Sequence, residues 1–319
     1  MLTRRRLLAS MATAGAALVV PHRGFAAAPT VRTAVAFDVP GGACDCHVHV
    51  FDPARFPYAA ERVYTPPEAS IADLRDLQAA LRLERVVIVQ PSVYGTDNSC
   101  TLDAIRALGP RARGVAVIGP ATPAADLDAM AKSGIKGVRL NFETAGETDP
   151  AAIKHHLAAV SEQIHSRNWH VQLNTSLAVV AALKDELAAL SFPVVLDHFA
   201  RAKAALGPSQ PGFAAMLELV RSGRVYVKIS AAYRTSDKAP DFPDAISLAQ
   251  ALVAANPERI VWGSNWPHPG RGATRTDIAP PYPNDDGLLL NQLPKWVPEA
   301  AARKRILVDN PARLYGFDG

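Results

Sequence analysis

The sequence has few cysteines, and those it has do not form an obvious disulfide framework. Its 319 residues include three, Cys44, Cys46 and Cys100, which is an odd number. Cys44 and Cys46 lie two apart, and inside one extended strand they are poorly placed to bridge each other. We therefore expect buried, free thiols that serve as neither nucleophiles nor metal ligands.

The chain also has no evident membrane anchor. The apolar, Ala-rich run from Leu7 to Val20 is shorter than the roughly 20 residues that a spanning helix needs. It follows Arg4-Arg5-Arg6 and precedes the small residues Gly24–Ala28, the order of a bacterial export signal with twin arginines. We expect residues 1–28 to be a twin-arginine-type signal peptide of a periplasmic protein, and residues 29–319 to form its single domain.

A strong charge of one sign is missing as well. The formal net charge of +4 comes from 34 basic and 30 acidic residues. Residues 1–26 hold four arginines and no acid, so the chain without its leader is formally neutral. No nucleic acid or anionic membrane is expected as a partner. The sequence leaves the oligomeric state open.

What the chain does have is a regular alternation of apolar strand-like runs with helical patterns, such as those at residues 70–77, 150–167 and 243–256. Eight buried strands separated by helices predict parallel βαβ units, and eight strands close a (βα)8 barrel. The expected strands are 43–50, 85–90, 114–118, 137–141, 170–174, 194–198, 225–230 and 259–263.

Two histidines stand out at the end of the first strand. Side chains alternate along a strand, so Asp45, His47 and His49 are expected on one face, and Cys44 and Cys46 on the other. A strand that merely happens to carry two histidines is the simpler interpretation. The adjacent Asp-Pro turn and a second histidine at the end of strand 194–198 favour a functional site.

The carboxyl ends of the other strands are polar and cationic. An arginine at three of these positions favours a substrate with carboxylates, which guanidinium groups bind through two parallel hydrogen bonds. Surface or ion-pair roles are the alternative for any single arginine. The residues are Ser92, Tyr94, Arg139, Asn141, Gln172, Asn174, Asp197, His198, Arg201, Ser230, Tyr233, Arg234, Asn265 and His268.

Four motifs carry a resemblance to a known family. They are His47-x-His49, Asp197-His198, the block from Trp262 to Pro269, and the Asn-Pro-Ala-Arg-Leu-Tyr run at 310–315. With them the sequence resembles the amidohydrolase superfamily, and most closely the branch of 2-pyrone-4,6-dicarboxylate lactonase and sulfomuconolactone hydrolases. The resemblance implies one distorted (βα)8 barrel that hydrolyses a small anionic lactone, in keeping with catabolism of aromatic compounds.

The resemblance also implies roles for individual residues. Histidines at positions 47, 49 and 198 would surround the ester carbonyl, and Tyr64, Ser92, Arg139, Arg201 and Arg234 would bind the carboxylates of the substrate. The acid or lysine and the further histidine that bind metal in other members are replaced here by Arg139 and by Gln172 or Asn174. No metal cofactor is expected. If one is present, zinc on His47, His49 and His198 is an acceptable set.

Two departures from the family pattern affect the mechanism. The family's general base is an aspartate where this chain has Asn265, and a carboxamide accepts no proton near neutral pH. A basic residue expected soon after Asn141 is replaced by Glu143 and its neighbours, which argues against the dicarboxypyrone itself as substrate.

We therefore expect imidazoles and arginine to polarise the carbonyl, and His198, His268 or a metal-bound hydroxide to activate water. Asp45 and Asp197 are expected to support the site, with Asp197 pointing away from His198. A covalent acyl-enzyme is disfavoured because no G-x-S-x-G motif is present. Two alternatives stay open: a metal-dependent hydrolase or decarboxylase, and an exported, non-catalytic binder of organic acids.

Overall fold

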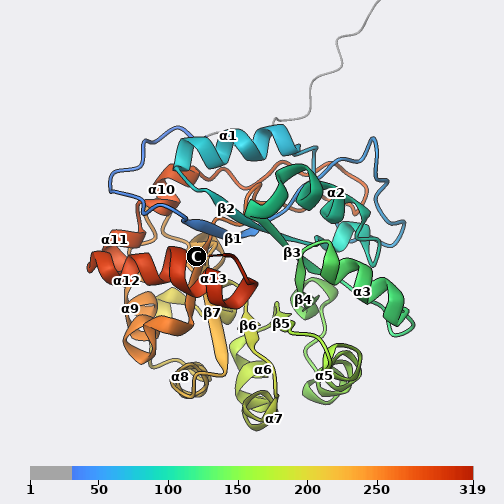
Figure 1. Ribbon diagram of the computed structural model, residues 1–319. Coiled ribbons are helices and arrows are strands. Elements are labelled where there is room, and N and C mark those ends of the chain that lie inside the picture. The colour runs from blue at the N-terminus through green and yellow to red at the C-terminus, as the bar shows by residue number, and fades with distance from the viewer. Residues whose placement is uncertain (1–30, 319) are drawn as a thin grey trace, which may run out of the picture.

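The computed structural model describes residues 31–318, so the expected signal peptide lies outside the described residues. Eight parallel strands stand in chain order and form a barrel with helices around it (Figure 1). The (βα)8 prediction is confirmed. The strands are β1 Cys44–Val48, β2 Arg85–Val89, β3 Ala112–Ala116, β4 Ile135–Leu140, β5 His170–Leu173, β6 Val194–Leu196, β7 Val225–Ser230 and β8 Ile260–Gly263.

Two hydrogen bonds beyond the strand ends join β8 to β1. The backbone N–H of Asn265 donates to His47 O at 2.9 Å, and that of His49 donates to Trp266 O at 2.8 Å. Gly263 permits this approach, because a Cβ there would lie 2.8 Å from the Cβ of His47. The two strands that carry the most distinctive sequence motifs are therefore neighbours.

The helices lie outside the barrel and cover the outer faces of the strands. The first shows why they form where they do: Ser70 Oγ accepts the N–H of Asp73, whose carboxylate accepts the N–H of Ser70. The α-helices are α1 Ile71–Leu81, α2 Ser99–Leu108, α3 Ala124–Lys132, α4 Phe142–Ala145, α5 Pro150–Ile164, α6 Leu177–Ala182, α7 Lys184–Ala189, α8 Phe213–Arg221, α9 Ala245–Ala255, α10 Asp286–Leu290, α11 Leu293–Trp296, α12 Ala300–Lys304 and α13 Asn310–Tyr315.

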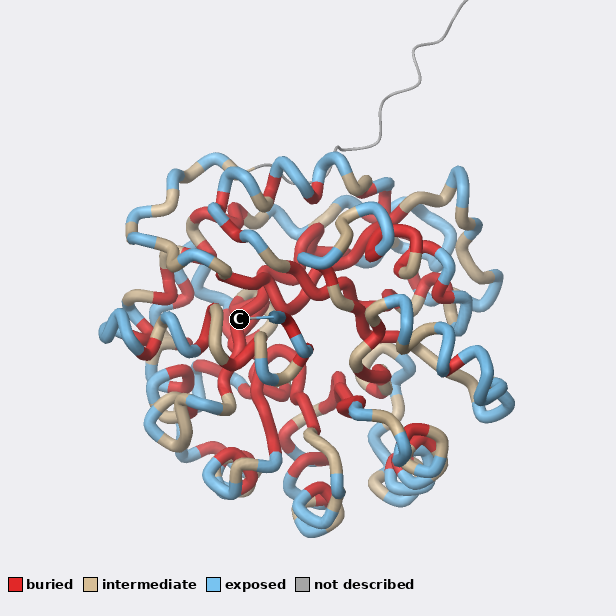
Figure 2. The backbone as a smooth tube through the Cα atoms, viewed as in Figure 1, coloured by how far each residue is buried: buried red, intermediate tan, exposed pale blue. Residues whose placement is uncertain are grey.

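The apolar core has two parts, and buried backbone follows the strands in Figure 2. The larger part fills the space between barrel and helices. The smaller one lies inside the barrel, where alternate residues of β2, β7 and β8 meet Cys44, Cys46 and the C-terminal Tyr315. Figure 1 accordingly places α13 near the centre of the ring of helices.

This interior position corrects one expectation. All three thiols are buried and free, as predicted. Cys44 and Cys46 nevertheless pack inside the barrel and do not face away from the histidines. The register of β1 against β2 shifts between Asp45 and Val48, so the strict alternation that the prediction assumed is interrupted there.

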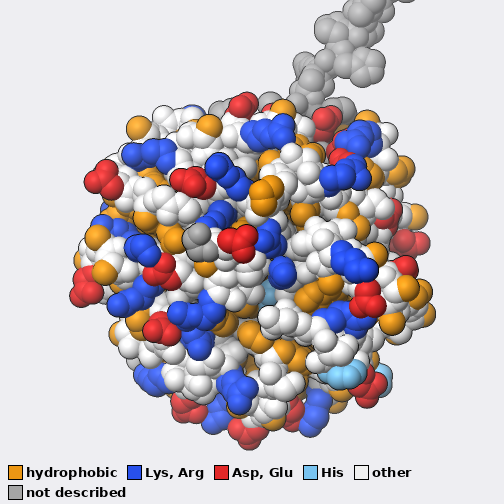
Figure 3. Space-filling model, viewed as in Figure 1, with side chains coloured by type: hydrophobic (Ala, Val, Ile, Leu, Met, Phe, Trp, Pro, Cys, Tyr) orange, Lys and Arg blue, Asp and Glu red, His pale blue; other side chains and the backbone are white. Residues whose placement is uncertain are grey.

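Basic and acidic side chains are interspersed on the face of the molecule shown in Figure 3. Among residues 31–318, no helix combines the length and the hydropathy that crossing a membrane requires.

Candidate active site

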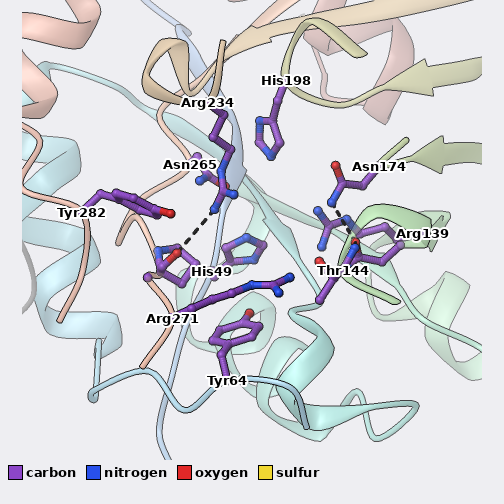
Figure 4. A pocket seen from close by; sticks show the side chains of 13 residues that line it. His49, Tyr64, Arg139, Thr144, Asn174, His198, Arg234, Asn265, Arg271 and Tyr282 are labelled. Atoms are coloured by element: carbon purple, nitrogen blue, oxygen red, sulfur yellow. Dashed lines mark hydrogen bonds between the residues drawn. The ribbon is translucent and has the colours of Figure 1, made fainter. Parts of the chain in front are cut away.

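A pocket opens at the carboxyl ends of the strands, where a (βα)8 barrel carries its functional residues (Figure 4). Six strand ends or the loops that follow them contribute to its wall, and its character is polar and cationic. The lining residues are His49, Tyr64, Arg139, Asn141, Thr144, Asn174, His198, Arg234, Asn265, Pro269, Gly270, Arg271 and Tyr282.

His49 is the histidine whose protonation pattern is best defined. Its Nδ1 lies 2.7 Å from the backbone oxygen of Val89, which can only accept a hydrogen bond. A neutral imidazole therefore carries its proton on Nδ1 and leaves Nε2 with a lone pair. Burial, with help from neighbouring His47, lowers the pKa of His49 well below its usual value. His49 is thus neutral at neutral pH.

Beneath the pocket lies a buried charge network centred on Asp197. One carboxylate oxygen accepts from Arg139 Nε and Gln172 Nε2, each at 3.1 Å. The other lies 3.2 Å from His47 Nδ1 and 3.6 Å from Lys228 Nζ. Burial alone would raise the pKa of Asp197, but the positive neighbours hold it well below the usual range.

His47 is held by this network and does not line the pocket. It is fully buried, and this burial lowers its pKa to about 3 despite the adjacent carboxylate. Its Nδ1 contacts both Asp197, which only accepts hydrogen bonds, and Lys228 Nζ at 3.4 Å, which only donates them. Its Nε2 has no hydrogen-bond partner among the described residues.

The chain after β6 brings Asp197 and His198 to the same side. His198 has φ +50° and begins a left-handed turn that continues to Arg201. This turn breaks the strand alternation, so the expectation that Asp197 points away from His198 is wrong. The His198 ring lies 4.6 Å from that of His47, and its Nδ1 contacts Ser230 Oγ at 2.8 Å.

Asn265 stands at the end of β8 and lines the pocket. Its Nδ2 donates to the hydroxyl of Tyr233 at 2.6 Å. That hydroxyl is 3.2 Å from His268 Nδ1, and His268 Nε2 is 3.1 Å from a carboxylate oxygen of Asp286. His268 is fully buried behind Tyr233 and is absent from the pocket wall, so it does not reach pocket water directly, contrary to its expected role as a base.

The predicted anion-binding residues divide into two groups. Tyr64, Arg139 and Arg234 line the pocket as expected. Ser92 and Arg201 are not in its wall. Ser92 has a buried Oγ and interacts with the side chain of Tyr64, and Arg201 is paired with Glu143 at 3.0 Å.

Sequence reasoning missed Lys228 and Arg271. A lysine inside the otherwise apolar run of β7 was a visible signal for a buried ion pair. Arg271 lies in a loop between Gly270 and Gly272, and only the fold shows that this loop reaches the pocket (Figure 4).

A metal-capable group is present, although it differs from the expected one. Ligand atoms of His47, Asp197 and His198 lie within 4.8 Å of one another. The nitrogens of the two histidines are chemically suitable. Asp197 fits poorly, because both of its oxygens already contact donors and two of these, Arg139 and Lys228, are cations that repel a divalent metal.

The chain is similar in sequence to known lactone hydrolases. The chain is 36% identical over 284 residues to 4-sulfomuconolactone hydrolase of Hydrogenophaga intermedia, covering 88% of this chain and 90% of the relative. It is 36% identical over 290 residues to a 2-pyrone-4,6-dicarboxylate hydrolase of Comamonas testosteroni, covering 88% and 92%.

A solved structure shows the same architecture. It is a probable 2-pyrone-4,6-dicarboxylic acid hydrolase of Acinetobacter baumannii with citric acid bound. It superposes with a TM-score of 0.72 at 27% identity, covering 86% of this chain and all of the other. The amidohydrolase family model matches residues 44–317. The chain is a member of the amidohydrolase family.

Proposed function

We propose that this protein is a lactonase that opens a small lactone bearing carboxylate or sulfonate groups. The observation that carries the proposal is the meeting, in one pocket, of three arginines with a histidine that presents an unprotonated nitrogen. Relatives named for hydrolysis of sulfomuconolactone and pyrone dicarboxylate support the same class of substrate.

Two arginines bind the acidic groups of the substrate. Arg139 is largely engaged by Asp197, whereas Arg234 and Arg271 have no carboxylate partner among the described residues. Arg234 Nε is buried without a hydrogen-bond partner, so a bound anion satisfies it. Arg271 lies beside Tyr64 on the wall opposite Arg234 and faces the pocket (Figure 4). The lactone lies between these two cations.

His49 and Asn265 hold the attacking water between them. Their segments are joined by the hydrogen bonds that connect β1 to β8, so the two side chains project from adjacent backbones. The lone pair on His49 Nε2 takes the proton of the water. The carboxamide of Asn265 orients the water without accepting that proton.

His198 polarises the carbonyl group. Burial lowers the pKa of His198 well below its usual value, so the ring is neutral. With Ser230 Oγ donating to Nδ1, Nε2 carries the proton and donates to the carbonyl oxygen. Water oxygen bonds to the carbonyl carbon, the ring C–O bond breaks, and the proton taken by His49 passes to the leaving oxygen. The product is the ring-opened acid.

This sequence of steps requires no metal or other cofactor. It uses neutral imidazoles, an amide and fixed arginines, all of which the chain supplies. We also propose that the enzyme works in the periplasm after export through its twin-arginine leader, a placement supported by the residues before position 29.

The test is hydrolysis of a panel of carboxylated and sulfonated lactones, which is monitored through the loss of absorbance of the lactone ring. Turnover is expected with the parent protein and with His155→Gln, a control on an exposed histidine of α5. His49→Gln should lower kcat by about 100-fold or more, because the base is lost. Binding of these lactones without turnover would instead identify a non-catalytic binder of organic acids.

A further inference from the structure

Three side chains stand in a row behind Asn265 and take no direct part in lining the pocket. The row runs from Asn265 Nδ2 to the Tyr233 hydroxyl at 2.6 Å, then to His268 Nδ1 at 3.2 Å. It ends where His268 Nε2 meets Asp286 Oδ1 at 3.1 Å, and neither side chain of this last pair is exposed. Within residues 31–318, neither the carboxylate oxygens of Asp286 nor His268 Nε2 has a hydrogen-bond partner, so the two side chains meet as a close buried polar contact and not as a hydrogen bond of regular geometry.

With a neutral imidazole at His268, the donors and acceptors in this row can be arranged in only one direction. The carboxylate of Asp286 attracts a proton on His268 Nε2, and a neutral imidazole then has Nδ1 as an acceptor. Tyr233 must give its single hydroxyl proton to that nitrogen. Its oxygen is left as an acceptor, and the only group of Asn265 that can donate to it is the Nδ2 amide.

We infer that Asp286 is a positioning residue that acts through His268 and Tyr233 to set which end of the Asn265 carboxamide faces the pocket. The amide nitrogen is turned toward Tyr233, and Oδ1 is presented to the pocket as a hydrogen-bond acceptor. In that position Asn265 Oδ1 orients the attacking water toward the substrate carbonyl, a role that rests on the proposed lactonase function.

The inference predicts that the row reverses when Asp286 becomes an amide. In Asp286→Asn the carboxylate that holds the proton on His268 Nε2 is lost, and when the new NH2 group faces Nε2 the imidazole proton moves to Nδ1 and points at the Tyr233 oxygen. Tyr233 then donates its hydroxyl proton to Asn265. The carboxamide of Asn265 therefore turns Oδ1 toward Tyr233 and Nδ2 toward the pocket. Size and shape at position 286 are unchanged, so the effect is on polarity alone.

The first measurement needs no substrate. The histidines are labelled with ¹⁵N, and the His268 signals are assigned by their loss in His268→Gln. We expect the protonated nitrogen to be Nε2 in the parent protein and Nδ1 in Asp286→Asn. Asp309→Asn, a change in an exposed ion pair with Lys304, serves as the control and should leave His268 as in the parent. A proton on His268 Nδ1 in the parent protein overturns the inference.

The second measurement is kinetic. Asp286→Asn should lower kcat by about 100-fold with little change in KM, because substrate binding is retained while the water loses its acceptor. Adding Asn265→Asp to Asp286→Asn should recover much of kcat, since a carboxylate accepts from Tyr233 and from water together. Failure of this second change to restore kcat contradicts the inference, because a merely structural defect at position 286 is not repaired at position 265.

Two outcomes separate this inference from the proposed function. If neither the parent protein nor any variant hydrolyses a lactone, the proposed function fails. The ¹⁵N signals of His268 still show the direction of the hydrogen bonds between Asn265 and Asp286. If Asp286→Asn does not fold, Tyr233→Phe removes the central hydroxyl and keeps the ring. That variant should show the same loss of kcat and the same recovery with Asn265→Asp, and normal kcat in Tyr233→Phe overturns the inference.

Discussion

Asp197 Oδ1 lies 3.2 Å from His47 Nδ1, with neither side chain exposed to solvent. This contact joins the end of β1 to the end of β6 across the barrel interior. The same carboxylate also neutralises Arg139 and Lys228, so one buried acid holds together three side chains from three further strands or strand ends. The ion network therefore supports the floor of the pocket.

Loss of Asp197 should be strongly destabilising. Asp197→Ala leaves Arg139 and Lys228 as buried cations without their partner, and removal of one member of a buried ion pair costs about 3–5 kcal/mol. Urea unfolding measures the free energy of unfolding. Glu218→Ala, which breaks an exposed pair with Lys184, is the control and should have little effect on the free energy of unfolding. Equal losses in the two variants would contradict a buried ionic floor.

Stability should also fall with acidification through His170. Burial lowers the pKa of this histidine to about 3, whereas the unfolded chain titrates near the ordinary value of 6.5. Between these values the unfolded state binds the additional proton, so stability is lost as pH falls from 6.5 toward 3. The contribution approaches about 1.4 kcal/mol per pH unit within that window. His170→Leu should have a shallower slope of unfolding free energy against pH between 4 and 6.5. A slope identical to that of the parent would show that His170 is not held neutral.

Arg271 should determine how strongly a second acidic group on the substrate is recognised. Arg271→Gln is expected to raise KM for a doubly charged lactone by about 10-fold or more, since a charge-assisted hydrogen bond contributes about 1.5–3 kcal/mol. KM for a singly charged lactone should change little, because Arg234 still binds it. Arg275→Gln removes an exposed arginine of the same loop that lies outside the pocket wall, and its KM values should match those of the parent. Equal effects of Arg271→Gln on both substrates would argue against a second anion site.

Treatment with a chelator should leave lactone hydrolysis unchanged. The acid in the metal-capable group is already engaged by Arg139 and Lys228, which disfavour a divalent cation beside it. The measurement is turnover before and after dialysis against chelator, together with elemental analysis of the purified protein. Activity that falls with chelation and returns in proportion to added zinc would establish a metal-dependent hydrolase.

Export should depend on the paired arginines of the leader. Replacing Arg4 and Arg5 together by lysine is expected to retain the protein in the cytoplasm, because the twin-arginine signal is lost while the positive charge is kept. Fractionation of bacterial cells followed by immunoblotting measures this. Arg23→Lys, near the expected cleavage region, is the control and should not affect export. Unchanged periplasmic recovery of the double variant would reject a twin-arginine route.

The barrel could be predicted because its signals are local and repeated. Each strand is a short buried run, and helical patterns separate the runs, so small errors at individual ends do not change the architecture. β6, for example, ends at Leu196 where 194–198 was expected, because His198 begins the left-handed turn.

The detailed orientation of the site could not be predicted in the same way. Side-chain alternation holds only while the backbone stays extended, and it fails at the register shift after Asp45 and at the positive φ of His198. The first irregularity lets His47 share the barrel interior with Cys44 and Cys46, and the second brings Asp197 beside His198. The position of Arg271 in the pocket could not be predicted, because its loop has no regular secondary structure and therefore no side-chain periodicity that relates it to the strands.

The barrel interior contains Tyr315, which packs with Cys44 and Cys46 of the first strand. Helix α13 and strand β1 therefore contribute to the same apolar core inside the barrel. During synthesis, α13 must leave the ribosome before this part of the interior can close, about 270 residues after β1 has emerged. A truncation that removes α13 would leave the first strand without its apolar cover.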